Sequence, residues 1–198
     1  HYSAKPSVVI SYSNAPTNEK TRIAVYRNGV EPATASMPYA YKQTDGTEGT
    51  VTFKITDYGK FYAVMLKGEG YEECSNRCYF RIGEGTVEFS LNKLVYETGE
   101  PITLFLEDVP AQNNDWVGIY AQGITPQDAI CPSWKYVGNN TTTQIDLNVA
   151  DARNYNGPLQ EGCYFANYFK NDGYDEAYDR IYFVIGKPCR ISQRTIST

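Results

Sequence analysis

The sequence has a single histidine, His1, and this scarcity excludes several kinds of catalytic site. Serine and cysteine nucleophiles ordinarily need a histidine base, so a hydrolytic triad is excluded. A copper brace on an N-terminal histidine needs a second histidine, which the chain lacks. The glycine-rich nucleotide-binding motifs and the H-E-x-x-H zinc motif are also absent. The sequence therefore predicts a protein that is not an enzyme.

Long apolar runs and basic clusters are missing as well. No stretch approaches the roughly eighteen apolar residues of a transmembrane helix. The first ten residues, HYSAKPSVVI, lack the basic-then-apolar layout of a signal sequence, so we expect an exported protein to appear here in its mature form. The formal net charge is −5 and the acidic residues are scattered. Because phosphate binding requires a basic stripe, nucleic acid is excluded as a partner.

The five cysteines are not arranged as zinc ligands, because no C-x-x-C pair occurs and the one histidine is at position 1. Disulfides are the better interpretation. The stretch NNTTT holds two overlapping N-glycosylation sequons, which start at Asn139 and Asn140. Both features favour an extracellular or cell-surface protein, since disulfides persist in oxidising surroundings.

The sequence is an internal duplication. Residues 59–83 align without a gap on residues 162–186, with eleven identities in twenty-five positions. Residues 8–29 align in the same way on residues 102–123. Each copy is close to the roughly 100 residues of an immunoglobulin-type sandwich.

Within each copy the apolar residues alternate with period two, as in Val51, Phe53 and Ile55, and turn signals such as Asn28-Gly29 separate the segments. This pattern is typical of strands with one buried face. It predicts an all-β protein of two tandem immunoglobulin-like antiparallel β-sandwiches. We place the first unit at residues 1–85, short of its opening strand, the second at 86–187, and a C-terminal tail at 188–198.

The second unit carries NDWVGIY (114–120), then Trp134, then GCYFANYFKNDGY (162–174). This pattern resembles SKICH-type domains, which are immunoglobulin-like sandwiches, over about Val87 to Gly186. The first unit is similar to a diverged copy, with TRIAVY in place of DWVGIY and no tryptophan after it. The resemblance implies a binding or targeting module that contacts membranes or other proteins. Similar tandem units also stand beside hydrolase domains, so the resemblance implies the fold more than a role.

Two disulfides are predicted from the expected hairpins. Cys74 and Cys78 flank the last hairpin of the first unit, which favours a short cross-hairpin bridge. Cys163 opens the strand that leads into the last hairpin of the second unit and Cys189 closes the returning strand, which favours a second bridge. Cys131 is then left over, either buried as a small hydrophobe or available to another chain.

The candidate ligand site lies in loops of the second unit. We expect the last hairpin loop to lie beside the loop that holds Asn113, Asn114 and Asp115, because loops at one end of a sandwich converge. Trp116 aligns with Arg22, which indicates either a partly exposed ring or a ring that covers the sandwich edge. Three alternatives stay open: a solvated acidic turn without ligand, a calcium site, or a grip for a carbohydrate or peptide. No other cofactor is expected. The candidate residues are Asn114, Asp115, Trp116, Asp172, Tyr174 and Asp175.

The two ends suggest a function. The second unit has a full lead-in strand, whereas the first has only HYSAKPS, and residues 187–198 stand where the lead-in to a third unit would stand. One hypothesis is that the tail of one molecule fills the gap in the next, which gives an end-to-end polymer. The alternatives are a flexible tail or a piece of a longer array. We therefore predict a structural or adhesive protein whose partners are other chains, including its own copies through the N- and C-terminal strands. The rival prediction is a carbohydrate- or membrane-binding accessory module.

Overall fold

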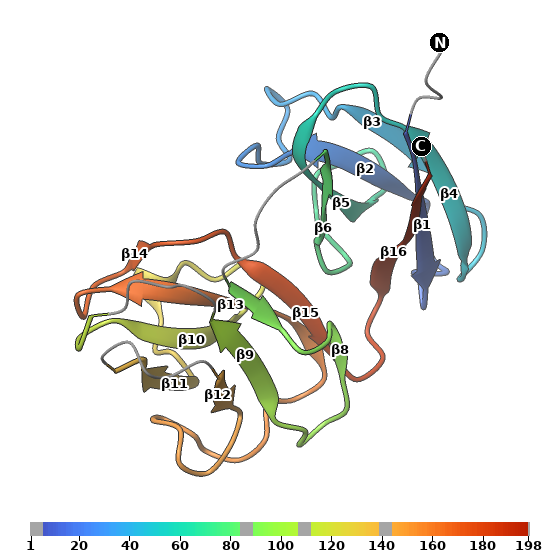
Figure 1. The fold of residues 1–198 in the computed structure, drawn as a ribbon. Helices are drawn as coiled ribbons and strands as arrows, with labels where there is room; N and C mark the ends of the chain where they lie inside the picture. The colour runs from blue at the N-terminus through green and yellow to red at the C-terminus, as the bar shows by residue number, and fades with distance from the viewer. Residues whose placement is uncertain (1–5, 84–88, 107–111, 139–143, 198) are drawn as a thin grey trace. The chain divides into compact units, whose positions relative to one another are not determined.

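The computed structural model describes residues 6–83, 89–106, 112–138 and 144–197 (Figure 1). The chain forms two compact units. Unit 1 comprises His1–Gly85 and Lys187–Thr198, and unit 2 comprises Thr86–Gly186. Within the described ranges, no helix is long and apolar enough to cross a membrane.

Unit 1 is a sandwich of two antiparallel sheets. One sheet has the strand order β16-β1-β4 and the other β3-β2-β5-β6. Residues such as Ile10, Val25 and Phe61 are fully buried between the sheets. The strands are β1 (Ser7–Ser13), β2 (Thr21–Arg27), β3 (Ala40–Gln43), β4 (Gly49–Lys54), β5 (Gly59–Lys67), β6 (Cys78–Ile82) and β16 (Arg190–Ser197).

Unit 2 repeats this plan. Its sheets have the orders β12-β9-β7 and β11-β10-β13-β15-β8, with β14 paired to β13. All of these pairs are antiparallel except β15 with β8, which is parallel. The elements are β7 (Phe89–Leu91), β8 (Val95–Tyr96), β9 (Ile102–Leu106), β10 (Trp116–Ala121), the 3-10 turn η1 (Pro126–Asp128), β11 (Ser133–Tyr136), β12 (Gln144–Leu147), β13 (Gly162–Lys170), β14 (Asp175–Glu176) and β15 (Ile181–Ile185).

The predicted fold class is confirmed: the protein is all-β, with two antiparallel sandwiches. The alignment of the copies also gave the correct inward faces, because Val117, Ile119 and their partners Ile23 and Val25 are fully buried. One detail differs. The central strands β5 and β13 are buried on both faces rather than one.

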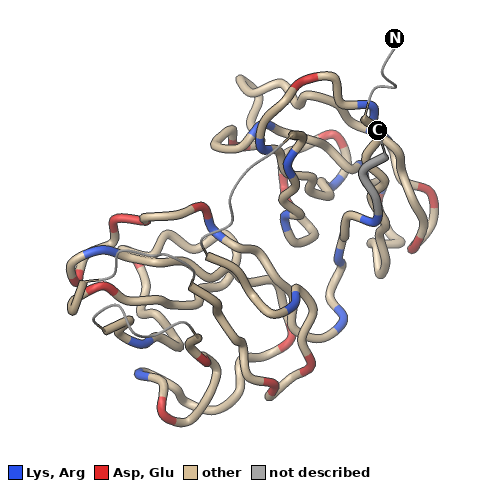
Figure 2. Tube along the Cα trace, viewed as in Figure 1, with Lys and Arg blue, Asp and Glu red and all other residues tan. Residues whose placement is uncertain are grey.

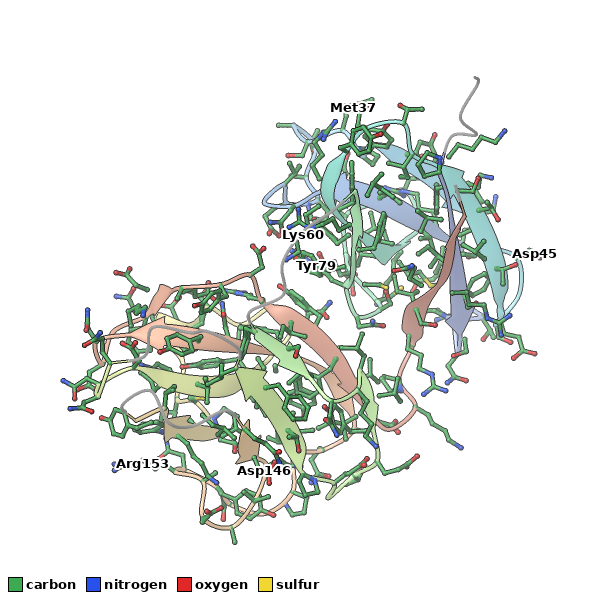
Figure 3. All side chains as sticks on the ribbon, in the orientation of Figure 1. Met37, Asp45, Lys60, Tyr79, Asp146 and Arg153 are labelled. Carbon is green, nitrogen blue, oxygen red and sulfur yellow. The ribbon has the colours of Figure 1, made fainter. Side chains whose placement is uncertain are left out.

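An aromatic layer covers the outer face of the larger sheet in both units. In unit 1, Tyr62 stacks between Tyr26 and Tyr79, at ring distances of 5.6 and 5.2 Å. In unit 2, Phe165 takes the place of Tyr62 and packs on Tyr120 and Tyr182. Figure 3 labels Tyr79 together with Lys60, whose ammonium lies 5.4 Å from the ring centre. Flat side chains and the methylene stems of cations thus bury the second face of β5 and β13.

The C-terminal residues form a strand of unit 1 rather than a separate tail. β16 pairs antiparallel with β1, from Ser7 opposite Ser197 to Ser13 opposite Arg190. Unit 2 has β7 in the equivalent place, paired antiparallel with β9. Gly186, with φ of +76°, lies at the turn that leaves β15. The strand of unit 1 that corresponds to β7 therefore comes from the segment that follows β15, the last strand of unit 2.

Charged residues are distributed over both units. In the described ranges, Figure 2 shows Lys and Arg interspersed with Asp and Glu along the traces, without a continuous stripe of one sign.

Candidate functional site

Two loops converge at one end of unit 2, as expected. The backbone N–H of Asp172 donates to the carbonyl of Asn114 at 2.8 Å. The N–H of Asn171 donates to Oδ1 of Asp115 at 3.1 Å. These bonds join the loop before β10 to the turn after β13, so the candidate residues lie close together.

Asp115 is the buried anchor of this loop pair. Its side chain is fully buried, and its Oδ2 accepts hydrogen bonds from the Tyr168 hydroxyl at 2.7 Å and the Lys170 ammonium at 2.9 Å. The backbone N–H of Gln112 adds a third donor at 3.0 Å. Burial acts to raise the pKa of Asp115, but these hydrogen bonds outweigh it and hold the pKa below the usual value. The oxygens of Asp115 are engaged inside the protein, where they order the two loops, and its role in ligand binding stays a prediction.

Trp116 also acts inside the unit. It is only 6% exposed, so the alternative of a partly exposed ring was wrong and the alternative of a ring that covers the sandwich edge fits. The indole stacks on Phe169 at 4.1 Å, and its Nε1–H donates to the carbonyl of Gly173 at 3.0 Å. In unit 1 the aligned Arg22 donates to the carbonyl of Gly70 at 2.8 Å. Because Gly70 aligns with Gly173, an arginine and a tryptophan perform the same task in the two copies.

The other candidates are exposed at the surface. Asn114, Asp172, Tyr174 and Asp175 are all exposed, and the Tyr174 ring stands edge-on to Trp116 with 48% exposure. Asp172 accepts a hydrogen bond from the hydroxyl of Tyr136 at 2.6 Å, which raises the pKa of that phenol. In sugar-binding sites, exposed aromatic rings pack on sugar rings, and carboxylate and amide groups beside them form hydrogen bonds with sugar hydroxyls. Their role in binding stays a prediction.

Three neighbouring residues extend this surface and were missed in the sequence. Trp134 and Tyr136 alternate along β11 and so share one face, with ring centres 5.0 Å apart. The guanidinium of Arg153, labelled in Figure 3, lies 5.0 Å from the first ring and 5.1 Å from the second. The period-two spacing of Trp134 and Tyr136 was the available signal. Arg153 gave none, because it comes from a connection that the first unit lacks.

A second missed feature occurs in both units. In unit 1, Arg77 lies over the Tyr62 ring at 4.6 Å and pairs with Glu73 at 2.6 Å. In unit 2, Arg180 lies over the Phe165 ring at 4.1 Å and pairs with Glu176 at 2.7 Å. Both pairs sit at aligned positions, and the two glutamates and two arginines are among the eleven identities. In both copies the shared phrase thus supplies a cation that lies over the central ring of the aromatic layer.

Unit 1 has a shallow depression of about 530 Å³ at the end that matches the loop end of unit 2. Its lining consists mainly of hydroxyl and charged groups. Residues 16–21 of this lining align with residues 110–115 of unit 2, which directly precede Trp116. The lining residues are Pro16, Thr17, Asn18, Glu19, Lys20, Thr21, Thr44, Gly46 and Thr47.

Neither predicted disulfide is present, since all five cysteines carry thiols. Cys163 lies opposite Val184 in unit 2, whereas Cys189 has already left that hairpin and precedes β16 in unit 1. Cys78 is buried opposite Ala63, while Cys74 lies beyond a loop and opposes Met65 instead.

The remaining expectations concern Cys131, metals and glycans. Cys131 is buried, and its thiol donates toward the carbonyls of Ile119 and Ser133, which fits the alternative of a small buried hydrophobe. In the part of the chain that the structure describes, no group of three or more His, Cys, Asp or Glu side chains is placed to hold a metal ion. Asn139 and Asn140 lie outside the described residues.

Comparison with known proteins assigns no family. No family model and no curated protein matches the chain. Among solved structures, a chain described as a biofilm associated protein, BSP domain, is similar over 90% of this chain, with 11% identity and a TM-score of 0.31. This chain spans 27% of the length of that one. A likeness of this size assigns neither a family nor a role, and the resemblance to SKICH-type domains stays a prediction.

Proposed function

We propose that this chain is a non-catalytic structural or adhesive protein of the cell surface or extracellular space, which assembles end to end by exchange of its C-terminal strand. The observation that carries the proposal is the place of β16, which fills the position in unit 1 that β7 fills in unit 2. Each unit thus takes its opening strand from the segment that follows the other unit.

Exchange requires no new contacts. β16 of a second copy offers β1 the same backbone groups and the same buried Ile191 as β16 of the same chain. Closed and exchanged forms therefore differ mainly in the conformation of the connection 186–189 and in the entropy of association, which is the condition for domain swapping. That connection is short and contains Pro188, and short stiff connections favour the exchanged form.

The test is the mass of the full chain in solution. We expect native mass spectrometry and negative-stain microscopy of concentrated protein to find dimers and longer end-to-end chains. Ile191→Asp, which places a carboxylate in the core of unit 1, is expected to abolish them. Ser192→Asp, on an exposed position of the same strand, is the matched control and keeps them. A wild-type chain that stays monomeric at every concentration would refute assembly by strand exchange.

A second candidate function is glycan binding at the loop end of unit 2. It is favoured by two exposed rings: Tyr136, whose hydroxyl donates to Asp172, and Tyr174, which stands edge-on to Trp116. Glycan-array binding that Tyr174→Ala removes would support it. Tyr58→Ala is the control, because Tyr58 is 80% exposed and belongs to unit 1. Loss of binding in both variants would point to nonspecific contact instead.

A further inference from the structure

The beginning of β16 is held against a loop of unit 1 by the side chain of Asn76. The Asn76 amide donates to the carbonyl of Ile191 at 2.9 Å, and its Oδ1 accepts from the Ile191 N–H at 2.8 Å. Both residues are buried, at 6% and 4% exposure. Asn76 thus takes the place of a neighbouring strand and fixes where the C-terminal segment enters unit 1.

Two residues before this contact, on each segment, stands a cysteine. The two thiols lie near enough to interact, and the neighbouring Cys189 raises the pKa of Cys74. They also share a neighbour, since Cys74 Sγ lies 3.5 Å from the carbonyl oxygen of Met65 and Cys189 Sγ lies 3.6 Å from its Sδ. Both cysteines are half-buried and pack on the core of unit 1. The two sulfur atoms are therefore adjacent, while remaining within reach of a reagent.

The other three cysteines are placed differently. Cys78 is buried, and burial raises the pKa of its thiol to about 11. Cys131 and Cys163 belong to unit 2. Of the five cysteines, Cys74 and Cys189 are the two whose half-buried thiols lie close together although their segments are far apart in the sequence.

We propose that Cys74 and Cys189 form a disulfide that ties β16 to unit 1. Each thiol gives up its hydrogen and the two sulfur atoms bond, while an external disulfide of the oxidised-glutathione class accepts the two electrons and two protons and is cleaved to two thiols. The bond would span the same sequence distance as the contact of Asn76 with Ile191, which is 115 residues. Such a long closed loop limits the unfolded chain strongly, so oxidation is expected to raise the thermal unfolding temperature of unit 1.

The surroundings set the rate of this step. The neighbouring Cys189 sulfur, toward which the Cys74 thiol is the donor, and the burial of that thiol both raise the pKa of Cys74 well above the usual value. Since the thiolate is the attacking form, exchange is expected to be slow at neutral pH and faster in mild alkali or with a disulfide isomerase.

The experiment oxidises the full reduced chain with a glutathione redox buffer and maps its peptides without reduction by mass spectrometry. The expected product is one peptide pair joined through Cys74 and Cys189, lighter by two hydrogen atoms. Cys74→Ser and Cys189→Ser are expected to lose both the cross-link and the rise in unfolding temperature, and Cys131→Ser to keep them. A different pairing, or both thiols still open to alkylation after oxidation, would overturn the proposal.

Two further measurements distinguish the possible results of this oxidation, namely differential alkylation and a non-reducing gel. Differential alkylation of wild-type protein needs no variant to fold, and it is expected to protect Cys74 and Cys189 together while Cys163 stays reactive. A non-reducing gel separates this inference from strand exchange. A cross-linked monomer supports the disulfide without exchange, whereas a ladder of covalent multimers supports both.

Discussion

Removal of the Asp115 carboxylate is expected to destabilise unit 2 strongly. In Asp115→Ala the Tyr168 hydroxyl, on a fully buried residue, loses its acceptor, as do the N–H groups of Gln112 and Asn171. The side chain of Lys170 is 30% exposed, so its ammonium can turn to water. Breaking a buried charged pair costs about 3 to 5 kcal/mol, and the partial exposure of Lys170 places this site at about 3 kcal/mol. That loss corresponds to roughly 12 to 24 °C in the unfolding temperature of a domain of this size.

The assay follows unit 2 alone. Both tryptophans, Trp116 and Trp134, belong to unit 2, so tryptophan fluorescence during urea unfolding reports on that unit and not on unit 1. Asp151→Ala is the matched control, because its carboxylate pairs with Lys135 at 79% exposure and should contribute little. Equal urea midpoints for Asp115→Ala and wild type would refute the anchoring role.

The same carboxylate predicts a pH dependence. The pKa of Asp115 is lowered in the folded state, so its contribution is fully present above the ordinary value of 3.8. It is lost as the pH falls from that value through the lower folded-state pKa. In the wild type we expect the urea midpoint of unit 2 to fall over this pH window. In Asp115→Asn the part of this fall that Asp115 causes should be absent. An unchanged acid dependence in Asp115→Asn would assign the effect to other carboxylates.

Three other predictions concern packing. Gly118→Ala would place a Cβ 2.6 Å from the Cys131 sulfur, so the urea midpoint of unit 2 by tryptophan fluorescence should fall, with a loss of about 1 to 3 kcal/mol. Arg77→Ala removes a guanidinium that is only 10% exposed over an aromatic ring and should cost unit 1 about 2 kcal/mol, measured by circular dichroism during urea unfolding. Ile191→Asp should destabilise unit 1 by about 3 kcal/mol or more while the tryptophan transition of unit 2 is unchanged; a shift in unit 2 alone would contradict the assignment of β16.

The duplication made much of the fold predictable. Two aligned copies show which positions stay apolar, so Val117 and Ile119 could be placed inside the sandwich from the sequence alone. The convergence of the loops around Asn114 and Asp172 followed from the general plan of a sandwich. The sequence did not specify which contacts each residue makes within that plan.

Trp116 illustrates this limit. Its alignment with Arg22 left two alternatives open, a partly exposed ring and a ring that covers the sandwich edge, because an arginine can also cover an edge with its methylene stem. The task shared by the two residues is donation of an N–H group to a glycine carbonyl, which an indole and a guanidinium both perform. The partners of Asp115 could not be predicted either, since Tyr168 and Lys170 come from a strand distant in sequence.

The cysteines could not be paired from local spacing, because the decisive neighbour is non-local. Cys189 comes close to Cys74 only when β16 returns to β1, and that return depends on which edge the last strand joins. A sequence pattern does not specify whether the last strand pairs with its own chain, with a further unit or with another copy of the protein.

The pairing of β16 in solution tests the central claim most directly. Hydrogen exchange of the full chain, measured at residue resolution, is expected to show slow exchange in residues 190–197 and in β1, at similar rates, because the two strands share hydrogen bonds. Exchange of residues 190–197 at the rate of an unstructured peptide, with β1 still protected, would contradict the completion of unit 1 by its C-terminal strand.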